Sequence, residues 1–155
     1  MIKMERIVYT IGHSNRTINE FLKLLRKYDI KIVVDVRRFP TSSKYPHFSL
    51  ENLRKILKSE GIRYIWLGDK LGGYRSGGYL KYMKCYIFKR GLEELIRIIE
   101  TCKVNLAIMC SEKFWFKCHR RFIANELVRR GYKVIHIVDS ERTNVHKFKE
   151  YTTDQ

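Results

Sequence analysis

The chain alternates short apolar runs with amphipathic segments. Runs rich in Val and Ile predict strands over residues 6–11, 30–36, 62–67, 104–110 and 133–138. Apolar residues at helical spacing predict helices over residues 17–28, 49–61, 79–102 (broken near Gly91) and 118–130. Strands that alternate with helices are typical of βαβ units with right-handed crossovers. We therefore expect an α/β fold over residues 1–155, a single-domain three-layer sandwich with a mainly parallel, Rossmann-like sheet of about five strands.

Local signals mark the ends of several of these elements. Thr17 and Glu20 have the spacing of a capping box, and Ser49 can cap the second helix, which Gly61 ends. The glycine-rich stretch 68–78 indicates a long loop that is functional or mobile. The basic tail, residues 140–155, is polar and predicts either a short final helix or a frayed end.

Side chains that can carry out chemistry follow the predicted strands. In parallel α/β sheets, ligands bind beyond the carboxyl ends of the strands, so we expect these side chains to converge at that edge. The candidate catalytic residues are Cys118, His119, His13, Asp35 and Cys110, and the candidate ligand-binding residues are Ser14, Arg37, His47, Glu112 and Arg120.

Cys118 is the candidate nucleophile. The dipole and free N–H groups of a helix start attract anions and lower the pKa of a thiol placed there. His119 or His13 is the candidate base, and Asp35 either orients that histidine or pairs with an arginine. Arg37 is placed to hold an anionic substrate through two hydrogen bonds. The alternative for Cys118 is a buried, inert thiol beside a structural histidine.

Metal binding is a second alternative at the same edge. The four cysteines contain no Cys-x-x-Cys spacing, so a structural zinc ribbon is not expected. Cys110, Cys118, His119 and His13 are nevertheless ligand types that suit zinc. We expect no cofactor, with zinc as the alternative.

The chain is strongly basic, with 32 Lys and Arg against 16 Asp and Glu and a formal net charge of +16. This surplus favours a nucleic acid or a phosphorylated small molecule as partner, although a solvated basic surface has the same composition. The stretches 39–48 and 74–86 interleave aromatic and basic residues, which suits base stacking. Trp115 and Phe116 form either a hydrophobic plug or a platform for a base. Abundant Lys, Arg and Ile with only two prolines would also suit a thermophile.

The hydropathy of the chain argues against a membrane partner. No apolar run approaches the roughly 20 residues that span a bilayer. The first residues also lack the apolar core of a signal peptide. We expect a cytoplasmic protein with reduced thiols.

Several motifs, in this order, resemble the domain of unknown function 488 family. They are Thr10-Ile-Gly-His-Ser14, Asp35-Val-Arg37 with Pro40 and Ser42, Pro46-His-Phe48, Leu71-Gly-Gly73, Met109-Cys-Ser-Glu112 and Cys118-His-Arg120. The similarity covers about residues 9–137. It implies a small cytosolic α/β domain and attaches no reaction to it.

A weaker likeness is to the active-site half of rhodanese domains, which also carry an Asp-x-Arg on an earlier strand. A rhodanese or phosphatase loop returns an Arg within six residues of its Cys to bind the oxyanion. Here the sixth residue after Cys110 is Phe116, and the first Arg is Arg120. That catalytic loop therefore does not carry over.

These observations favour a nucleotide- or nucleic-acid-processing enzyme with a Cys/His/Asp/Arg site at the carboxyl edge of the sheet. The alternative is a nucleic-acid-binding protein without catalysis, and a rhodanese- or phosphatase-like thiol enzyme is the third interpretation. A protein that only binds needs cations and aromatic rings, but it does not need thiols, imidazoles and a carboxylate gathered together.

Overall fold

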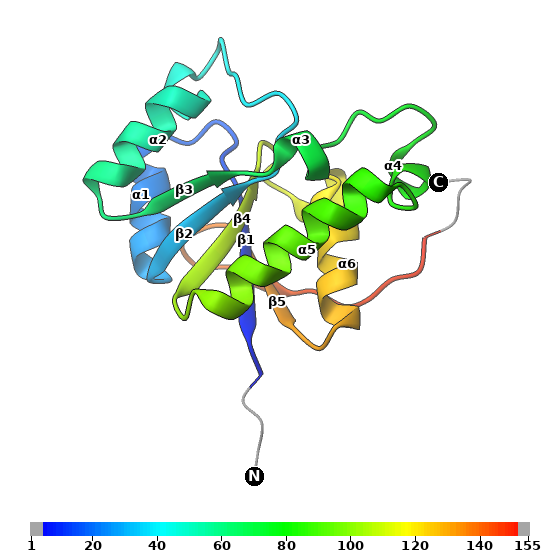
Figure 1. The fold of residues 1–155 in the computed structure, drawn as a ribbon. Helices are drawn as coiled ribbons and strands as arrows, with labels where there is room; N and C mark the ends of the chain where they lie inside the picture. The colour runs from blue at the N-terminus through cyan, green and yellow to red at the C-terminus, as the bar shows by residue number, and fades with distance from the viewer. Residues whose placement is uncertain (1–4, 152–155) are drawn as a thin grey trace.

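The computed structural model describes residues 5–151 and contains a six-stranded sheet (Figure 1). The strand order is β3-β2-β4-β1-β5-β6, in which β1 to β5 pair in parallel and β6 is antiparallel to β5. The strands are β1 (Ile7–Gly12), β2 (Ile30–Asp35), β3 (Arg63–Trp66), β4 (Asn105–Cys110), β5 (Lys133–Ile137) and β6 (Thr143–Val145). The predicted α/β class and mainly parallel sheet are confirmed, with one strand more than expected.

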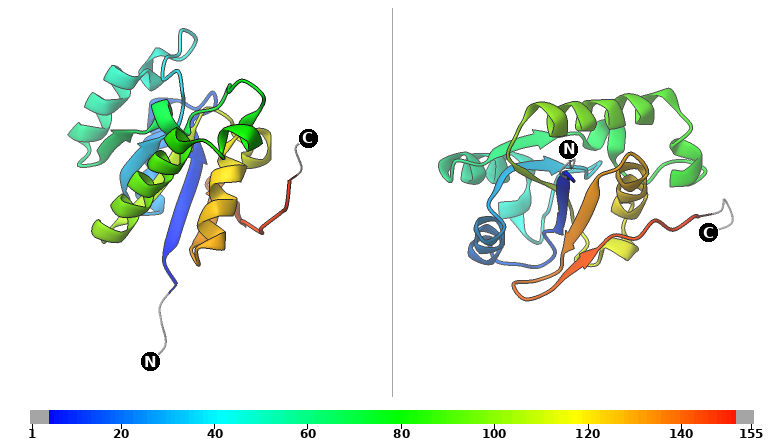
Figure 2. Two further views of the ribbon diagram at one scale, coloured as in Figure 1. Left: turned by 45° about the vertical axis from the view of Figure 1, so that its right-hand side comes forward. Right: turned by 90° about the horizontal axis from the view of Figure 1, so that it is seen from below.

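Helices cover both faces of this sheet, as the apolar strands predicted. The α-helices are α1 (Ile18–Lys27), α2 (Leu50–Ser59), α3 (Gly68–Leu71), α4 (Tyr79–Tyr82), α5 (Tyr86–Thr101) and α6 (Arg120–Arg129), with 3₁₀ turns η1 (Pro46–Phe48) and η2 (Trp115–Lys117). One buried cluster joins α1 and α2 to the sheet, and the other joins α3, α5 and α6 to its opposite face. The views in Figure 2 show these layers on either side of the strands.

The start of α1 follows the capping prediction. Thr17 Oγ1 accepts a hydrogen bond from Glu20 N at 3.1 Å, and the Glu20 carboxylate accepts one from Thr17 N at 3.4 Å. Ser49 also occupies the N-cap of α2, but its side chain makes no capping bond. Its hydroxyl bonds instead to the backbone of Ser42, so it ties the preceding loop to the helix start.

The predicted break near Gly91 is wrong, because α5 continues through that residue. A Cβ at Gly91 would lie 2.7 Å from the Cβ of Lys70, so the glycine allows α3 and α5 to approach closely. The interruption lies earlier, between α4 and α5, where Cys85 has extended backbone angles and caps α5.

The tail is the second correction, because the described part of residues 140–155 is neither helical nor frayed. A turn at Asp139, whose carboxylate accepts hydrogen bonds from two backbone N–H groups at 2.9 Å, leads into β6. Residues 146–151 then continue in an irregular path, beginning with a hydrogen bond from His146 N to Val134 O. Residues 152–155 lie outside the described part of the chain.

The strand order creates a crevice at the carboxyl edge of the sheet. β1 and β4 are neighbours, with Gly12 opposite Cys110. The chain leaves β1 toward α1 on one face and leaves β4 toward α6 on the other. Loops that diverge in this way leave a gap in which α/β proteins bind ligands. No helix in residues 5–151 is long and apolar enough to cross a membrane.

Candidate active site

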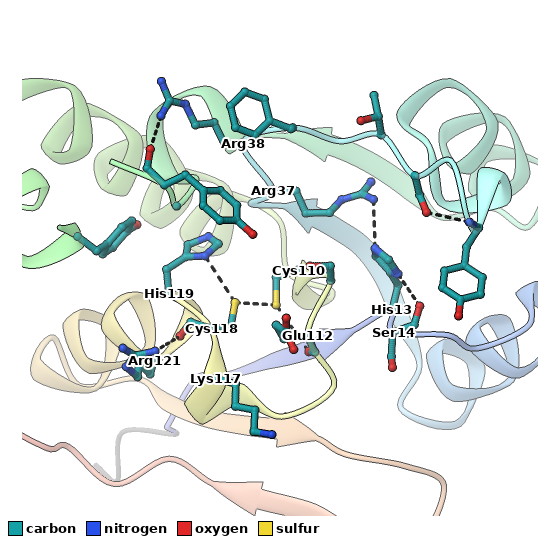
Figure 3. Close-up of a pocket in the computed structure, with 18 of the residues that line it drawn as sticks. His13, Ser14, Arg37, Arg38, Cys110, Glu112, Lys117, Cys118, His119 and Arg121 are labelled. Atoms are coloured by element: carbon teal, nitrogen blue, oxygen red, sulfur yellow. Dashed lines mark hydrogen bonds between the residues drawn. The ribbon is translucent and has the colours of Figure 1, made fainter. Parts of the chain in front are cut away.

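A cavity of about 1000 Å³ occupies this crevice. Its lining includes seven of the predicted site residues, which Figure 3 shows together: His13, Ser14, Arg37, Cys110, Glu112, Cys118 and His119. The other three predicted residues, Asp35, His47 and Arg120, stand behind this lining and support it. The predicted site residues therefore converge at the carboxyl edge of the sheet, as expected.

The loops after β1 and β4 are joined directly by their backbones. His13 N donates to Cys110 O, and Ser14 N donates to Ser111 O, both at 2.9 Å. Gly12 makes this approach possible, because a Cβ there would lie 1.7 Å from Glu112 O. Ser14 has a positive φ of 51°, which turns the loop away from the sheet.

Cys118 and Cys110 form a pair of thiols on the cavity wall, with sulfurs 2.8 Å apart. Cys118 lies just before α6 rather than inside it, because the helix begins at Arg120 with His119 as its N-cap. The Cys118 sulfur still faces the helix start, where it accepts a hydrogen bond from Arg120 N at 3.4 Å. Cys118 therefore lies at the N-terminus of a helix in space, as predicted, although in the chain it precedes the first helical residue by two positions.

His119 is oriented by a backbone carbonyl on a different strand. Its Nε2 donates to Val36 O at 2.9 Å, so this nitrogen carries a hydrogen. The other ring nitrogen, Nδ1, lies 3.5 Å from the Cys118 sulfur. A neutral ring with this tautomer presents a lone pair to the thiol, and it becomes a cation if it takes the thiol proton.

The two thiols have opposite electrostatic environments. Burial alone would raise the pKa of Cys118, but the hydrogen bonds that it shares with Cys110 and His119, together with the charges of His119 and Arg120, lower that pKa well below its usual value. Burial and the hydrogen bond to Cys118 raise the pKa of Cys110 well above its usual value. Ionisation of the pair is therefore favoured at Cys118 over Cys110.

On the opposite wall, His13 is held by hydrogen bonds at both ring nitrogens (Figure 3). Its Nδ1 donates to Ser14 O at 2.9 Å, and its Nε2 accepts from Arg37 Nη1 at 3.2 Å. Burial, with the charge of Arg37, lowers the pKa of His13 to about 4. This imidazole is neutral near pH 7 and is not placed to act as a base toward Cys118.

Asp35 pairs with Arg37 rather than orienting a histidine. The carboxylate is fully buried and accepts from Arg37 Nε at 2.9 Å and Nη2 at 2.7 Å. It also accepts from Arg37 N at 3.0 Å and from the Tyr64 hydroxyl. Burial alone would lower the pKa of Arg37, but the hydrogen bond and the charge of Asp35 raise that pKa. Of the two roles considered for Asp35, the structure places it in the ion pair, and sequence reasoning missed Tyr64.

Arg120 was expected to bind ligand, but its side chain is 1% exposed and points into the protein. Its Nη2 donates to Glu112 O at 2.7 Å and its Nη1 donates to Thr10 Oγ1 at 3.2 Å. It therefore supports the loop after β4 from behind. His47 is likewise turned from the cavity, since its Nε2 donates to Arg16 O at 3.1 Å and its ring packs on Phe48.

Arg120 is the first member of a buried chain of hydrogen bonds that the sequence did not suggest. From Thr10 Oγ1 the chain passes to His136 Nδ1 at 2.6 Å. His136 Nε2 then bonds to His146 Nδ1, and His146 Nε2 to Asn125 Oδ1, both at 2.8 Å. Each group can donate to the next, which requires both histidines to be neutral.

The pKa values of these two histidines agree with that arrangement. Burial, with the charge of Arg120, lowers the pKa of His136 to about 2. Burial lowers the pKa of His146 to about 4. Trp115 stacks on His136 with ring centroids 4.6 Å apart, which favours the hydrophobic plug for this residue. Phe116 remains 52% exposed.

The rim of the cavity is basic and aromatic, and part of it comes from the stretches 39–48 and 74–86 that the sequence analysis named. Arg38, Lys44, Lys117 and Arg121 line it, against Glu112 as the acidic residue of the lining. Within the described residues, no ion pair involves any of these four cations. Phe39 and Tyr74 are 61% and 85% exposed, with ring centroids 6.2 Å apart. The clustering of basic residues in the predicted loops was the available signal.

The geometry gives no support to the zinc alternative. Among residues 5–151, no group of three or more His, Cys, Asp or Glu side chains is placed to hold a metal ion. Both nitrogens of His13 already have hydrogen-bond partners, which removes it from a set of ligands with the thiols.

Comparison with known proteins gives one finding. The family model described as "Domain of unknown function DUF488" matches residues 17–127, which is about 70% of the chain. No curated protein and no solved structure matches.

Proposed function

This chain belongs to the domain of unknown function DUF488 family, and from that premise we propose that it is a thiol-dependent enzyme acting on a nucleotide or nucleic acid. The family description attaches no reaction, so the proposal depends on the chemistry of the cavity. The observation that carries it is the Cys118 sulfur on the cavity wall, between His119 Nδ1 and the first N–H of α6.

Cys118 acts as the nucleophile in this proposal. A thiolate is the reactive form of cysteine, and an adjacent imidazole and a helix start both favour it. His119 serves as the acid–base group, because its Nε2 is committed to Val36 O and its Nδ1 faces the sulfur. His13 and Arg37 shape the opposite wall, since their polar atoms are largely engaged with each other and with Asp35.

The charge of the rim supports a substrate that carries phosphate. Arg38, Lys44, Lys117 and Arg121 bring positive charge to the mouth of the cavity, and the whole chain carries a net charge of +16. Exposed Phe39 provides a ring on which a base can stack. Cations for phosphate and rings for bases are the combination that suits nucleotides and single strands.

The alternative is binding of nucleic acid without catalysis. The rim favours it as much as it favours an enzyme, because cations and exposed rings are all that binding requires. The thiol pair is what separates the two functions. A rhodanese- or phosphatase-like reaction is less favoured, because the segment 111–117 that links the thiols contains no arginine to bind an oxyanion.

Alkylation by iodoacetamide at about pH 6, mapped by mass spectrometry, tests the proposed nucleophile. We expect Cys118 to react faster than the exposed Cys85, because an ordinary thiol is mostly protonated at that pH. His119→Ala should shift the reaction of Cys118 to higher pH. A Cys118 that reacts only after unfolding would refute the nucleophile.

The same labelling tests the substrate class. A nucleoside monophosphate or a single-stranded oligonucleotide should slow the alkylation of Cys118, and inorganic phosphate should do so less. Lys117→Ala should weaken that protection, whereas Lys103→Ala, an exposed lysine outside the cavity lining, should not. Binding of oligonucleotide that leaves Cys118 fully reactive would favour the alternative, a protein that only binds.

A further inference from the structure

We propose that Cys118 and Cys110 form a hydroperoxide-sensitive dithiol, in which peroxide oxidises Cys118 and Cys110 then closes an intramolecular disulfide. The proposal goes beyond the function above. It uses the thiol pair but requires neither a nucleotide nor a nucleic acid.

The positions of the two sulfurs carry the inference. They lie 2.8 Å apart, whereas a disulfide bond is about 2.05 Å long, so closing it takes a shift of less than about 1 Å. Both cysteines are reduced in this structure. Cys118 has an extended backbone and precedes α6, so a shift of its side chain leaves the i to i+4 hydrogen bonds between residues of that helix in place.

The environments of the two thiols assign their roles. Both sulfurs line the cavity, but Cys118 is 7% exposed, and its lowered pKa favours the thiolate that reacts with a small peroxide. Cys110 is only 1% exposed, and its raised pKa favours the protonated thiol. The pair thus has the arrangement of an oxidised and a resolving cysteine.

The chemistry takes two steps with a hydroperoxide as the oxidant. The Cys118 thiolate attacks one peroxide oxygen, so that an S–O bond forms, the O–O bond breaks and hydroxide leaves; Cys118 is then a sulfenic acid. The Cys110 sulfur next attacks the Cys118 sulfur, so that an S–S bond forms and the S–O bond breaks. The departing OH leaves as water with the Cys110 proton, and the two sulfurs have together given two electrons to the peroxide.

The oxidised pair would leave the cavity without its nucleophile. The sulfur that His119 and the start of α6 activate would be tied to Cys110, and reduction by an external dithiol would restore it. Disulfide formation would also protect Cys118 from irreversible oxidation to a sulfinic acid, because the resolving thiol of Cys110 lies beside it.

The test treats the full chain with one equivalent of hydrogen peroxide near pH 7 and no other ligand. Of the four free cysteines, two should be lost, with Cys110 and Cys118 joined in one pair of proteolytic peptides that dithiothreitol separates. Cleavage at Lys113 or Lys117 places the two cysteines on different peptides. Cys85→Ser is the matched control, and it should lose the same two thiols.

Cys110→Ser provides the second measurement. Without the resolving thiol, Cys118 should be trapped by dimedone as a sulfenic acid and then proceed to a sulfinic acid. Oxidation of wild-type Cys118 to a sulfinic acid without the linked peptides would overturn the proposal, as would faster oxidation of Cys85. The linked-peptide result decides the question alone if Cys110→Ser does not fold. Because this test contains no nucleotide, a negative result would overturn the dithiol proposal without bearing on the proposed substrate class.

Discussion

Acid should destabilise this protein through three buried histidines. His13, His136 and His146 are 5%, 1% and 4% exposed, and each is held as a neutral ring by its hydrogen bonds. Their pKa values fall from 6.5 to about 4, about 2 and about 4. Between about pH 6.5 and pH 4 the unfolded chain therefore binds more protons than the folded one. The contribution of these groups to stability is complete above about pH 6.5 and is lost as the pH falls.

The size of the effect follows from these pKa values. At about pH 5, a histidine with a pKa of 6.5 unfolded and about 4 folded loses about 2 kcal/mol of its contribution. Three such groups together give a loss of about 6 kcal/mol between about pH 7.5 and pH 5. That is a large part of the roughly 5–15 kcal/mol by which a domain is usually stable. Ordinary surface carboxylates titrate mostly below this window.

Urea unfolding at the two pH values, followed by circular dichroism, measures the loss. His146→Gln keeps a donor and an acceptor beside Asn125 and His136 but removes one titrating group. Its free energy of unfolding should therefore change by about one third less between the two pH values. A wild-type change below about 2 kcal/mol would show that these rings are not held neutral, and would refute the directed chain of hydrogen bonds from Arg120.

Three further expectations concern the buried ion pair, the close approach of the loops after β1 and β4, and the basic surface. Arg37→Met should cost about 3–5 kcal/mol in urea unfolding because it leaves Asp35 buried without its cation; Asp35→Asn in the same chain should recover part of that loss, and additive costs would contradict the pairing. Gly12→Ala should destabilise by about 1–3 kcal/mol, because its Cβ would overlap Glu112 O; an unchanged urea midpoint would contradict the close approach. Nucleic acid should bind at low salt with a Kd of about 10⁻⁶ M and weaken steeply as salt rises; a fluorescence titration that detects no binding would refute it.

Prediction from sequence succeeded where the evidence was local. The apolar runs located five strands, and the spacing of Thr17 and Glu20 located the start of α1, because these signals depend only on neighbouring residues. The placing of polar side chains at strand ends also predicted which loops meet, since parallel strands share one carboxyl edge. β6 was missed because its three residues are all exposed and show no alternation.

Side-chain direction was the part that sequence patterns did not determine. Arg120 follows two predicted site residues, but the first turn of α6 directs it inward, where Thr10 and the carbonyl of Glu112 bind it. Tyr64 stands on a strand with ordinary β residues, and only the pairing of β3 with β2 brings it to Asp35. Such partners are distant in sequence, so no local spacing reveals them.

The buried chain of hydrogen bonds also sets an order of events during biosynthesis. It runs from Arg120 through Thr10, in the first strand, to Asn125, which bonds the backbone of Lys149 after the last strand. The ribosome makes the N-terminal segments first. Asn125 and the two histidines bonded in series with it therefore lack part of their support until residues near Lys149 have been synthesised. A nascent chain that has not reached Lys149 would hold Asn125 without its backbone partner, so the histidine end of the hydrogen-bond chain would be completed last.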